Sequence, residues 1–150
     1  MTRAKKTGIT LFVLVLVIGG LWFYWERPLS LGDLIPREAW TDLELLQDDA
    51  TNTGTYVTFQ DPPLDKILIQ LQATRVTRAA KDRLLVGKYF QILLHKGESY
   101  PTMLYVEENG QIHVAAELDF DHWKNYEGGE ELYTYLSILS QRLPAVYPVD

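Results

Sequence analysis

The stretch PTMLYVEENGQIHVAAE, residues 101–117, predicts a β-hairpin in the middle of a folded domain. Its two β-rich runs, 101–107 and 111–117, are joined through an Asn-Gly pair at 109–110. Asn-Gly is the strongest short hairpin signal, because both residues tolerate a positive φ angle. A third β-rich run, 87–95, precedes the hairpin across a short polar turn. The three runs together predict an antiparallel meander.

An amphipathic helix is predicted on each side of this meander. The first follows Asp61, whose carboxylate can accept hydrogen bonds from backbone N–H groups, and it continues to Gln72 with Leu and Ile at helical spacing. The second follows a Gly-Gly pair, carries leucines at helical spacing over 132–143, and ends before Pro144. Each helix therefore has one apolar face that needs a sheet to cover.

Three further strands are predicted before the meander, at 40–46, 55–60 and 73–78. The first two are separated by a segment rich in Asp, Asn, Thr and Gly, which is typical of a turn. We therefore expect an α+β fold, in which a small antiparallel sheet of about five to six strands is covered by two amphipathic helices.

Residues 9–25, ITLFVLVLVIGGLWFYW, carry no charge and predict a membrane-spanning helix. As a helix they would rise about 26 Å, close to the hydrocarbon thickness of about 30 Å. Cations precede the run and four aromatic residues end it, which predicts a cytoplasmic N-terminus and an outer domain. The predicted layout is a basic cytoplasmic N-terminus (1–8), a transmembrane helix (9–25), a linker (26–37), an extracytoplasmic α+β domain (38–143) and a tail (144–150).

A cleavable secretory signal is the alternative for this segment, since it too begins with cations and an apolar run. Such a signal ends in small residues, whereas this run ends in aromatic residues followed by Glu26 and Arg27. An uncleaved anchor is therefore expected. Gly19 and Gly20 are a weak signal for helix pairing, because they lack the four-residue spacing of a dimer motif.

The charge is distributed unevenly along the chain. Removing the cations Arg3, Lys5 and Lys6 from the net charge of −6 leaves −9 for the remainder. A surface this acidic disfavours nucleic acid as a partner. The chain has no cysteine, which excludes disulfides, thiolate metal sites, a cysteine nucleophile and a lipidated cysteine.

Several motifs occur in an order that resembles a known family. They are the helix at 61–72 followed by Arg75, Thr77 and Arg78, the run YVEENGQI at 105–112, and Tyr126 before a closing helix at 130–138. This order resembles a family of uncharacterised Gram-positive (Firmicutes) extracytoplasmic domains carried behind a single N-terminal membrane helix. The resemblance covers about 34–139 and implies a fold and a location, but no catalytic residue.

An acidic segment is a weak candidate for a metal site. Alternation would put Glu117, Asp119 and Asp121 on one side of an extended segment, with His113 or His122 nearby. The spacing matches neither a calcium loop nor a zinc helix motif, so a solvated strand face is the simpler interpretation. We expect no metal and no other cofactor.

A basic stretch is the first candidate for partner binding. Its five cations are Arg75, Arg78, Lys81, Arg83 and Lys88. Such a cluster suits an anionic envelope polymer, lipid headgroups or an acidic protein. The alternative is a solvated loop that protects an edge strand from aggregation.

Aromatic residues are the second candidate, since they can line a groove for a carbohydrate or a peptide. The set comprises Trp40, Trp123, Tyr126, Tyr133, Tyr135 and Tyr147. Packing explains Trp40 on a strand and Tyr135 on a helix. Trp123 and Tyr126 fall in a predicted loop, where binding residues concentrate.

The sequence contains no glycine-rich phosphate loop, nucleophile elbow or paired-histidine metal motif, so we do not expect an enzyme. The leading hypothesis is a non-catalytic interaction or sensor domain on the outer side of the cell membrane, tethered by one helix. An accessory subunit of a membrane complex, acting mainly through its transmembrane helix, is the alternative. An envelope hydrolase is third.

Overall fold

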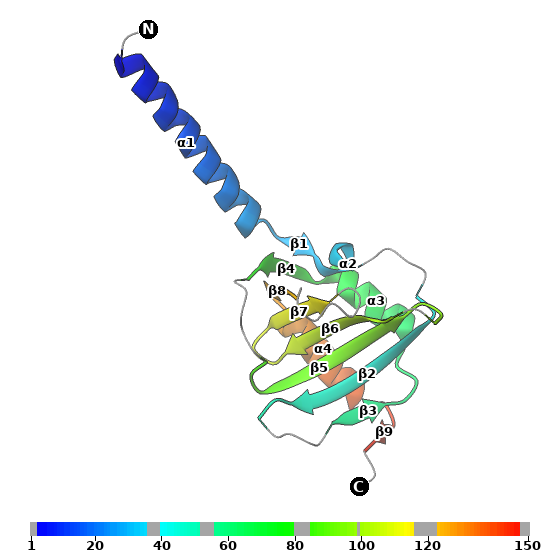
Figure 1. The fold of residues 1–150 in the computed structure, drawn as a ribbon. Helices are drawn as coiled ribbons and strands as arrows, with labels where there is room; N and C mark the ends of the chain where they lie inside the picture. The colour runs from blue at the N-terminus through cyan, green and yellow to red at the C-terminus, as the bar shows by residue number, and fades with distance from the viewer. Residues whose placement is uncertain are drawn as a thin grey trace.

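The computed structural model describes residues 3–35, 40–51, 56–79, 85–98, 100–115 and 123–147, with 3–7 as backbone only. A long helix, α1 (Arg3–Glu26), projects from a body built on one antiparallel sheet (Figure 1). The α+β class is confirmed. Over the described residues the sheet has nine strands, more than the five to six expected.

The sheet is antiparallel throughout. Its strands are β1 (Leu29–Ser30), β2 (Asp42–Asp49), β3 (Val57–Phe59), β4 (Arg75–Arg78), β5 (Lys88–His95), β6 (Thr102–Glu107), β7 (Gln111–Ala115), β8 (Lys124–Glu127) and β9 (Ala145–Val146). They lie in the order β1-β4-β8-β7-β6-β5-β2-β3-β9. Both edge strands are two residues long and follow a proline, Pro28 or Pro144, which limits pairing with another chain.

The predicted hairpin is confirmed as β6 and β7. Tyr105 pairs with His113, and the turn places Gly110 at a φ of +84°. The side-chain oxygen of Asn109 accepts a hydrogen bond from the Gln111 N–H at 2.9 Å. The Asn-Gly pair therefore sets both the turn and the register of the two strands.

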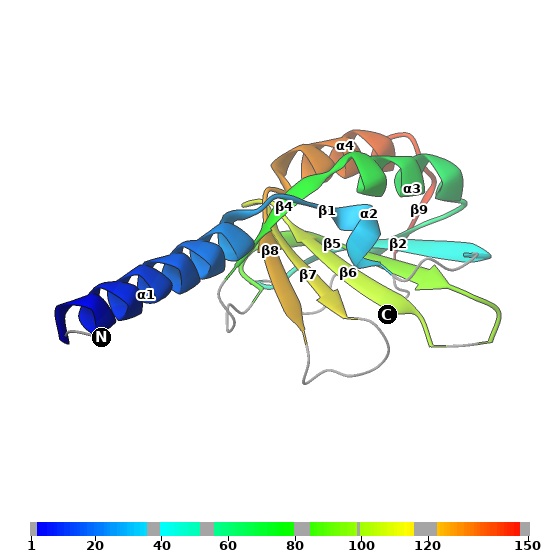
Figure 2. The same cartoon turned by 90° about the horizontal axis from the view of Figure 1, so that it is seen from above.

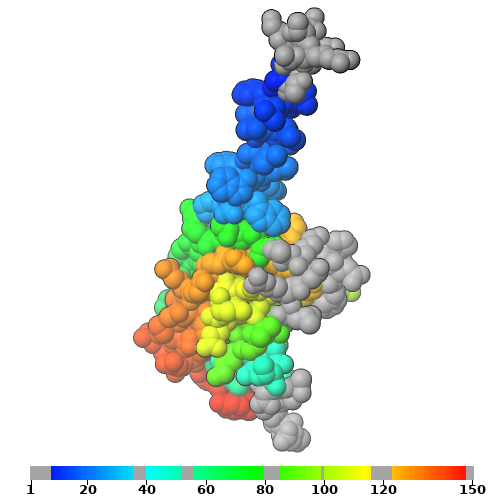
Figure 3. Space-filling model, turned by 90° about the vertical axis from the view of Figure 1, so that its left-hand side faces the viewer, coloured from blue at the N-terminus to red at the C-terminus, as the bar shows by residue number. Residues whose placement is uncertain are grey.

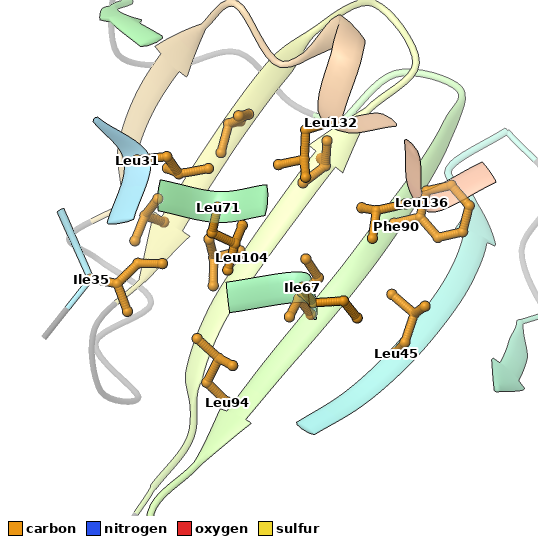
Figure 4. Close-up of a cluster of buried hydrophobic side chains, with 14 of the residues drawn as sticks. Leu31, Ile35, Leu45, Ile67, Leu71, Phe90, Leu94, Leu104, Leu132 and Leu136 are labelled. Atoms are coloured by element: carbon orange, nitrogen blue, oxygen red, sulfur yellow. The ribbon is translucent and has the colours of Figure 1, made fainter. Parts of the chain in front are cut away.

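The two predicted helices, α3 (Leu64–Ala73) and α4 (Glu130–Ser140), lie on the same face of the sheet (Figure 2). Between helices and sheet lies the core (Figure 4), whose labelled residues are Leu31, Ile35, Leu45, Ile67, Leu71, Phe90, Leu94, Leu104, Leu132 and Leu136. Burial of each such side chain contributes about 1.5–3 kcal/mol to stability.

Residues 26–37, which we expected to be a linker, contain β1 and the short helix α2 (Leu31–Leu34). Strand β1 pairs with β4, and the Leu31 N–H donates to the Thr74 carbonyl oxygen at 2.9 Å. Leu31 and Ile35 are buried in the core. Proline and glycine in this segment resemble linker composition, but its apolar residues are spaced to reach the core. The body therefore begins almost directly after α1.

Gly128, between β8 and α4, lies close to the backbone of β4. Its φ is +105°, and an added Cβ would lie 2.8 Å from the Arg75 carbonyl oxygen on β4. We expect Gly128→Ala to lower the free energy of unfolding by about 1–3 kcal/mol, because both the φ angle and the contact become strained. Urea unfolding of the full chain in detergent measures this change.

Gly87→Ala is the matched control for this prediction. Gly87 has a similar φ of +88°, but no atom of the described residues lies within 4 Å of an added Cβ. The Gly128 variant should therefore be the less stable of the two. Equal losses would mean that the close approach to Arg75 contributes nothing.

Candidate functional site

The sheet face opposite α3 and α4 carries a row of polar side chains. We call this face of the sheet the polar face. Gln91, Tyr105, His113 and Asn125 stand in one cross-strand row over β5, β6, β7 and β8. Side chains alternate between the two faces along a strand, so the positions between them carry the apolar core. The polar face is therefore a direct consequence of the register.

A buried pair of side chains, Glu107 and His113, lies within the polar face. His113 Nε2 is 2.6 Å from Glu107 Oε1, and the two side chains are only 6% and 1% exposed. The other carboxylate oxygen, Glu107 Oε2, accepts a hydrogen bond from the Val86 N–H at 2.8 Å. His113 Nδ1 lies 2.8 Å from Asn125 Oδ1. Every polar atom of the pair thus has a partner.

Both ring nitrogens of His113 face side-chain oxygens, one from the carboxylate of Glu107 and one from the amide of Asn125. Removal of one partner of a buried pair leaves an uncompensated charge, which is strongly destabilising. The pair joins β6, β7, β8 and the segment before β5, and at this burial it presents no surface to a ligand.

Next to this pair lies a partly exposed row of aromatic rings, which we call the aromatic row. It consists of Tyr89 on β5, Tyr105 on β6 and Trp123 just before β8. The ring centroids of Tyr89 and Tyr105 are 5.6 Å apart, and those of Tyr105 and Trp123 are 4.9 Å apart in an edge-on contact. The Tyr89 hydroxyl donates to Asp48 Oδ2 at 2.9 Å. Aromatic surface with a polar rim of this kind suits a sugar ring or a peptide side chain.

Burial raises the pKa of the Tyr105 phenol, and burial together with the hydrogen bond to Asp48 raises the pKa of Tyr89. When folding raises the pKa of a phenol, the neutral phenol stabilises the folded protein. This contribution is fully present at a pH below the pKa of the phenol in the unfolded chain, about 10, and it is lost as the pH rises through the pKa of the phenol in the folded protein. The aromatic row therefore contributes to stability at neutral pH and loses that contribution in alkali.

Between pH 8 and pH 11 the free energy of unfolding should fall by about 1 kcal/mol less in Tyr89→Phe than in the unsubstituted protein, after allowance for partial exposure. The reason is that Phe has no phenol to ionise in the unfolded chain. Urea unfolding of the full chain in detergent at the two pH values measures this. Tyr147→Phe, at an exposed side chain, is the control. An unchanged pH dependence in Tyr89→Phe would contradict the prediction.

The predicted basic stretch is not one patch among the residues that the structure describes. Arg75 and Arg78 lie on β4, whereas Lys88 begins β5, and three strands separate β4 from β5. Strand spacing places β4 and β5 about 19 Å apart. Lys81 and Arg83 lie outside the described residues.

Arg78 already has partners within the chain. Its Nη1 donates to the Tyr24 carbonyl oxygen at 2.6 Å, and its guanidinium carbon lies 4.0 Å from the centroid of the Tyr24 ring. Arg75, on the same strand, is exposed. The two arginines that were predicted together thus differ, since Arg78 holds α1 while Arg75 faces solvent.

The predicted aromatic candidates also lie in different parts of the fold. Trp123 belongs to the aromatic row, whereas Tyr126 lies on the helix side of the sheet and is 5% exposed. Trp40, Tyr133 and Tyr135 pack against the core, and Tyr147 is exposed. This location of Tyr126 suits packing rather than a ligand contact.

The weak metal candidates Glu117, Asp119, Asp121 and His122 lie outside the described residues. Within the ranges that the structure describes, no group of three His, Asp or Glu side chains could hold a metal ion. No sequence motif singled out the pair of Glu107 and His113. The signal for it was the three-residue turn at 108–110, which puts positions 107 and 113 on the same face of the hairpin.

The remaining candidate feature is the long helix α1. Its segment from Gly8 to Glu26 is long and apolar enough to cross a membrane, and none of it is buried against the rest of the protein. A core helix of a soluble protein would be mostly covered, so packing within the chain does not explain this apolar surface. Comparisons with protein-family models, with curated proteins and with solved structures find no match to this chain.

Proposed function

We propose that the chain is a single-pass membrane protein whose outer domain binds a partner without catalysing a reaction. The observation that carries the proposal is the bare helix α1, whose large apolar side chains from Ile9 to Trp25 are 47–69% exposed. Transfer of each such side chain from water to an apolar environment is favourable by about 1.5–3 kcal/mol. The hydrocarbon core of a membrane provides that environment. The body beginning at Leu29 has a core of its own.

The flanks of α1 support an orientation with the N-terminus in the cytoplasm. Arg3, Lys5 and Lys6 precede the apolar segment, and cations close to a membrane span favour the cytoplasmic side. Trp22 and Trp25 are at the other end, where aromatic rings favour the headgroup region. The body would then face the outside of the cell, as the resemblance to Gram-positive extracytoplasmic domains also implies.

The aromatic row is the surface that we propose for binding, with a protein or an envelope polymer as the partner. Tyr89, Tyr105 and Trp123 supply large, partly exposed rings held in place by each other and by Asp48. Rings fixed in this way lose little conformational entropy on binding. Tethering also raises the effective concentration of the domain near the envelope, so that weak binding suffices.

Site-specific photo-crosslinking in living cells tests this function. A photoreactive residue at position 123 should capture a defined partner, and Tyr105→Ala should reduce the capture at least fivefold. Position 138, exposed on the opposite side at α4, is the control and should capture nothing specific. Equal capture from 123 and 138 would contradict binding through the aromatic row.

Replacement of α1 by an unrelated membrane anchor separates this function from the alternative. Capture from position 123 should survive the replacement if the outer domain binds the partner. Loss of capture would instead favour an accessory subunit that acts through its transmembrane helix.

A further inference from the structure

We propose that the sheet edge formed by β1 and β4 rests on the lipid headgroups of the membrane that α1 crosses. The partner of this edge is the phosphate layer of the outer leaflet. The contact residues are Arg27 and Arg75, which are exposed, while Arg78 holds the edge to α1. The proposal rests on the proposed membrane crossing by α1. It adds that the domain is held edge-on at the membrane surface rather than hanging freely from a tether.

The depth of the edge follows from the end of α1. The apolar segment closes with Trp22, Phe23, Tyr24 and Trp25, and Glu26 is the last residue of the helix. Aromatic rings at the end of a membrane span sit at the level of the headgroups. Tyr24 therefore marks that level.

Strand β4 is held to this marker by direct contacts. Arg78 donates to the Tyr24 carbonyl oxygen at 2.6 Å and lies over the Tyr24 ring at 4.0 Å. The last carbonyl groups of a helix lack partners within the helix, so this donor satisfies one of them. Figure 3 shows the end of α1 seated on the body of the protein. Arg78 is therefore at headgroup level whenever these contacts hold.

The short connection after α1 restricts the domain further. Only Arg27 and Pro28 separate α1 from β1, and two residues span at most about 7 Å. Strand β1 then pairs with β4, through Leu29 with Val76 and Ser30 with Arg75. The domain cannot swing away from the membrane without breaking this pairing or the contacts of Arg78.

The charges at this edge suit individual phosphate contacts rather than a strong attractive field. Arg27 and Arg75 are exposed, and guanidinium groups bind phosphate through paired hydrogen bonds. The exposed carboxylates Glu26, Asp33 and Glu127 are nearby in the fold and offset the positive charge. Binding should accordingly depend only modestly on salt.

The opposite edge of the sheet is far from the membrane on this proposal. Eight strand spacings separate β1 from β9, which is about 38 Å measured along the sheet. Figure 1 shows β9 across the body from α1. The two edges therefore provide an internal comparison.

Spin labels on the full chain in nanodiscs test the proposal. Because the chain has no cysteine, single labels can be placed at Ala73, just before β4, at Val146 on β9, and at Leu16 in α1. The nanodiscs contain equimolar phosphatidylcholine and phosphatidylglycerol with a trace of nickel-chelating lipid. We expect relaxation of the Ala73 label by headgroup nickel to exceed that of the Val146 label at least threefold. Equal relaxation at the two positions would overturn the proposal.

The Leu16 label separates this inference from the proposed function. High accessibility to oxygen and low accessibility to water-soluble quencher at Leu16 would show that α1 is in the hydrocarbon. If Leu16 is in the bilayer while Ala73 relaxes like Val146, only the edge-on arrangement fails. If Leu16 is in water, the membrane crossing itself fails, and the inference fails with it.

Substitution of Arg78 tests the residue that holds the edge. Arg78→Gln removes the guanidinium group from Tyr24, and we expect at least a twofold drop in nickel relaxation at Ala73. Lys88→Gln, at an exposed cation on β5, is the matched control and should leave the relaxation unchanged. Near-UV circular dichroism of both variants checks that the sheet is intact. Unchanged relaxation in a folded Arg78→Gln variant would contradict a holding role for Arg78.

Discussion

Replacement of His113 by alanine lowers the free energy of unfolding by about 3–5 kcal/mol, because it leaves the Glu107 carboxylate buried without its partner on β7. The pair is almost fully shielded from water, and its contact distance is 2.6 Å. The same substitution leaves the Asn125 side-chain oxygen without the ring nitrogen that it faces, His113 Nδ1. Urea unfolding of the full chain in detergent at neutral pH measures the loss.

His95→Ala is the matched control for this prediction. His95 Nε2 also lies 2.9 Å from a glutamate oxygen, Glu44 Oε1, but it is not aligned as a hydrogen bond, and the side chains are 24% and 51% exposed. Exposed pairs of this kind contribute about 0–1 kcal/mol. A loss in His113→Ala no greater than that in His95→Ala would contradict the role assigned to the buried pair.

The paired replacement of Leu16 and Val17 by arginine is expected to prevent membrane integration of α1. An arginine near the centre of a transmembrane helix costs about 2.5–3.5 kcal/mol on insertion scales, so two cost about 5–7 kcal/mol. The fraction of protein that sediments with membranes after alkaline carbonate extraction measures the effect.

Replacement of the same two residues by alanine keeps α1 uncharged and is the control for the arginine pair. The alanine variant should remain in the membrane fraction, while the arginine variant moves to the soluble or aggregated fraction. Retention of the arginine variant in membranes would mean that another part of the protein, and not α1, holds it there.

The parts of the fold that sequence could predict are those whose signal is local. Asn109 and Gly110 specify the central hairpin by their own backbone preferences, and the helical spacing of apolar residues specifies α3 and α4. The predicted and observed bounds of these elements differ by only a few residues.

The strands β1 and β9 could not be predicted, because two residues carry no periodicity. Their formation depends on partners far along the chain: Leu29–Ser30 pairs with Arg75–Val76, and Ala145–Val146 pairs with Thr58–Phe59. For the same reason residues 26–37 resembled a linker. Their role follows from the position of β4, which local sequence does not encode.

The candidate site also has features that local sequence indicates and features that depend on tertiary contacts. Trp123 could be selected from its loop position, but its contact with Tyr105 depends on how β8 aligns with β7. Spacing in the sequence groups Arg78 with neighbouring cations. In the fold its partner is Tyr24, which lies 54 residues away in α1. Contacts between segments so far apart arise from tertiary packing and not from spacing.

Labelling of single cysteines in intact cells tests most directly the claim that α1 is an uncleaved anchor with the body outside. Tyr147→Cys, at an exposed position near β9, should react with a membrane-impermeant maleimide before lysis. Lys6→Cys should react only after lysis, and both proteins should sediment with membranes at the mass of the uncleaved chain. Labelling of position 6 in intact cells, or loss of the α1 segment from the mature protein, would contradict the claim.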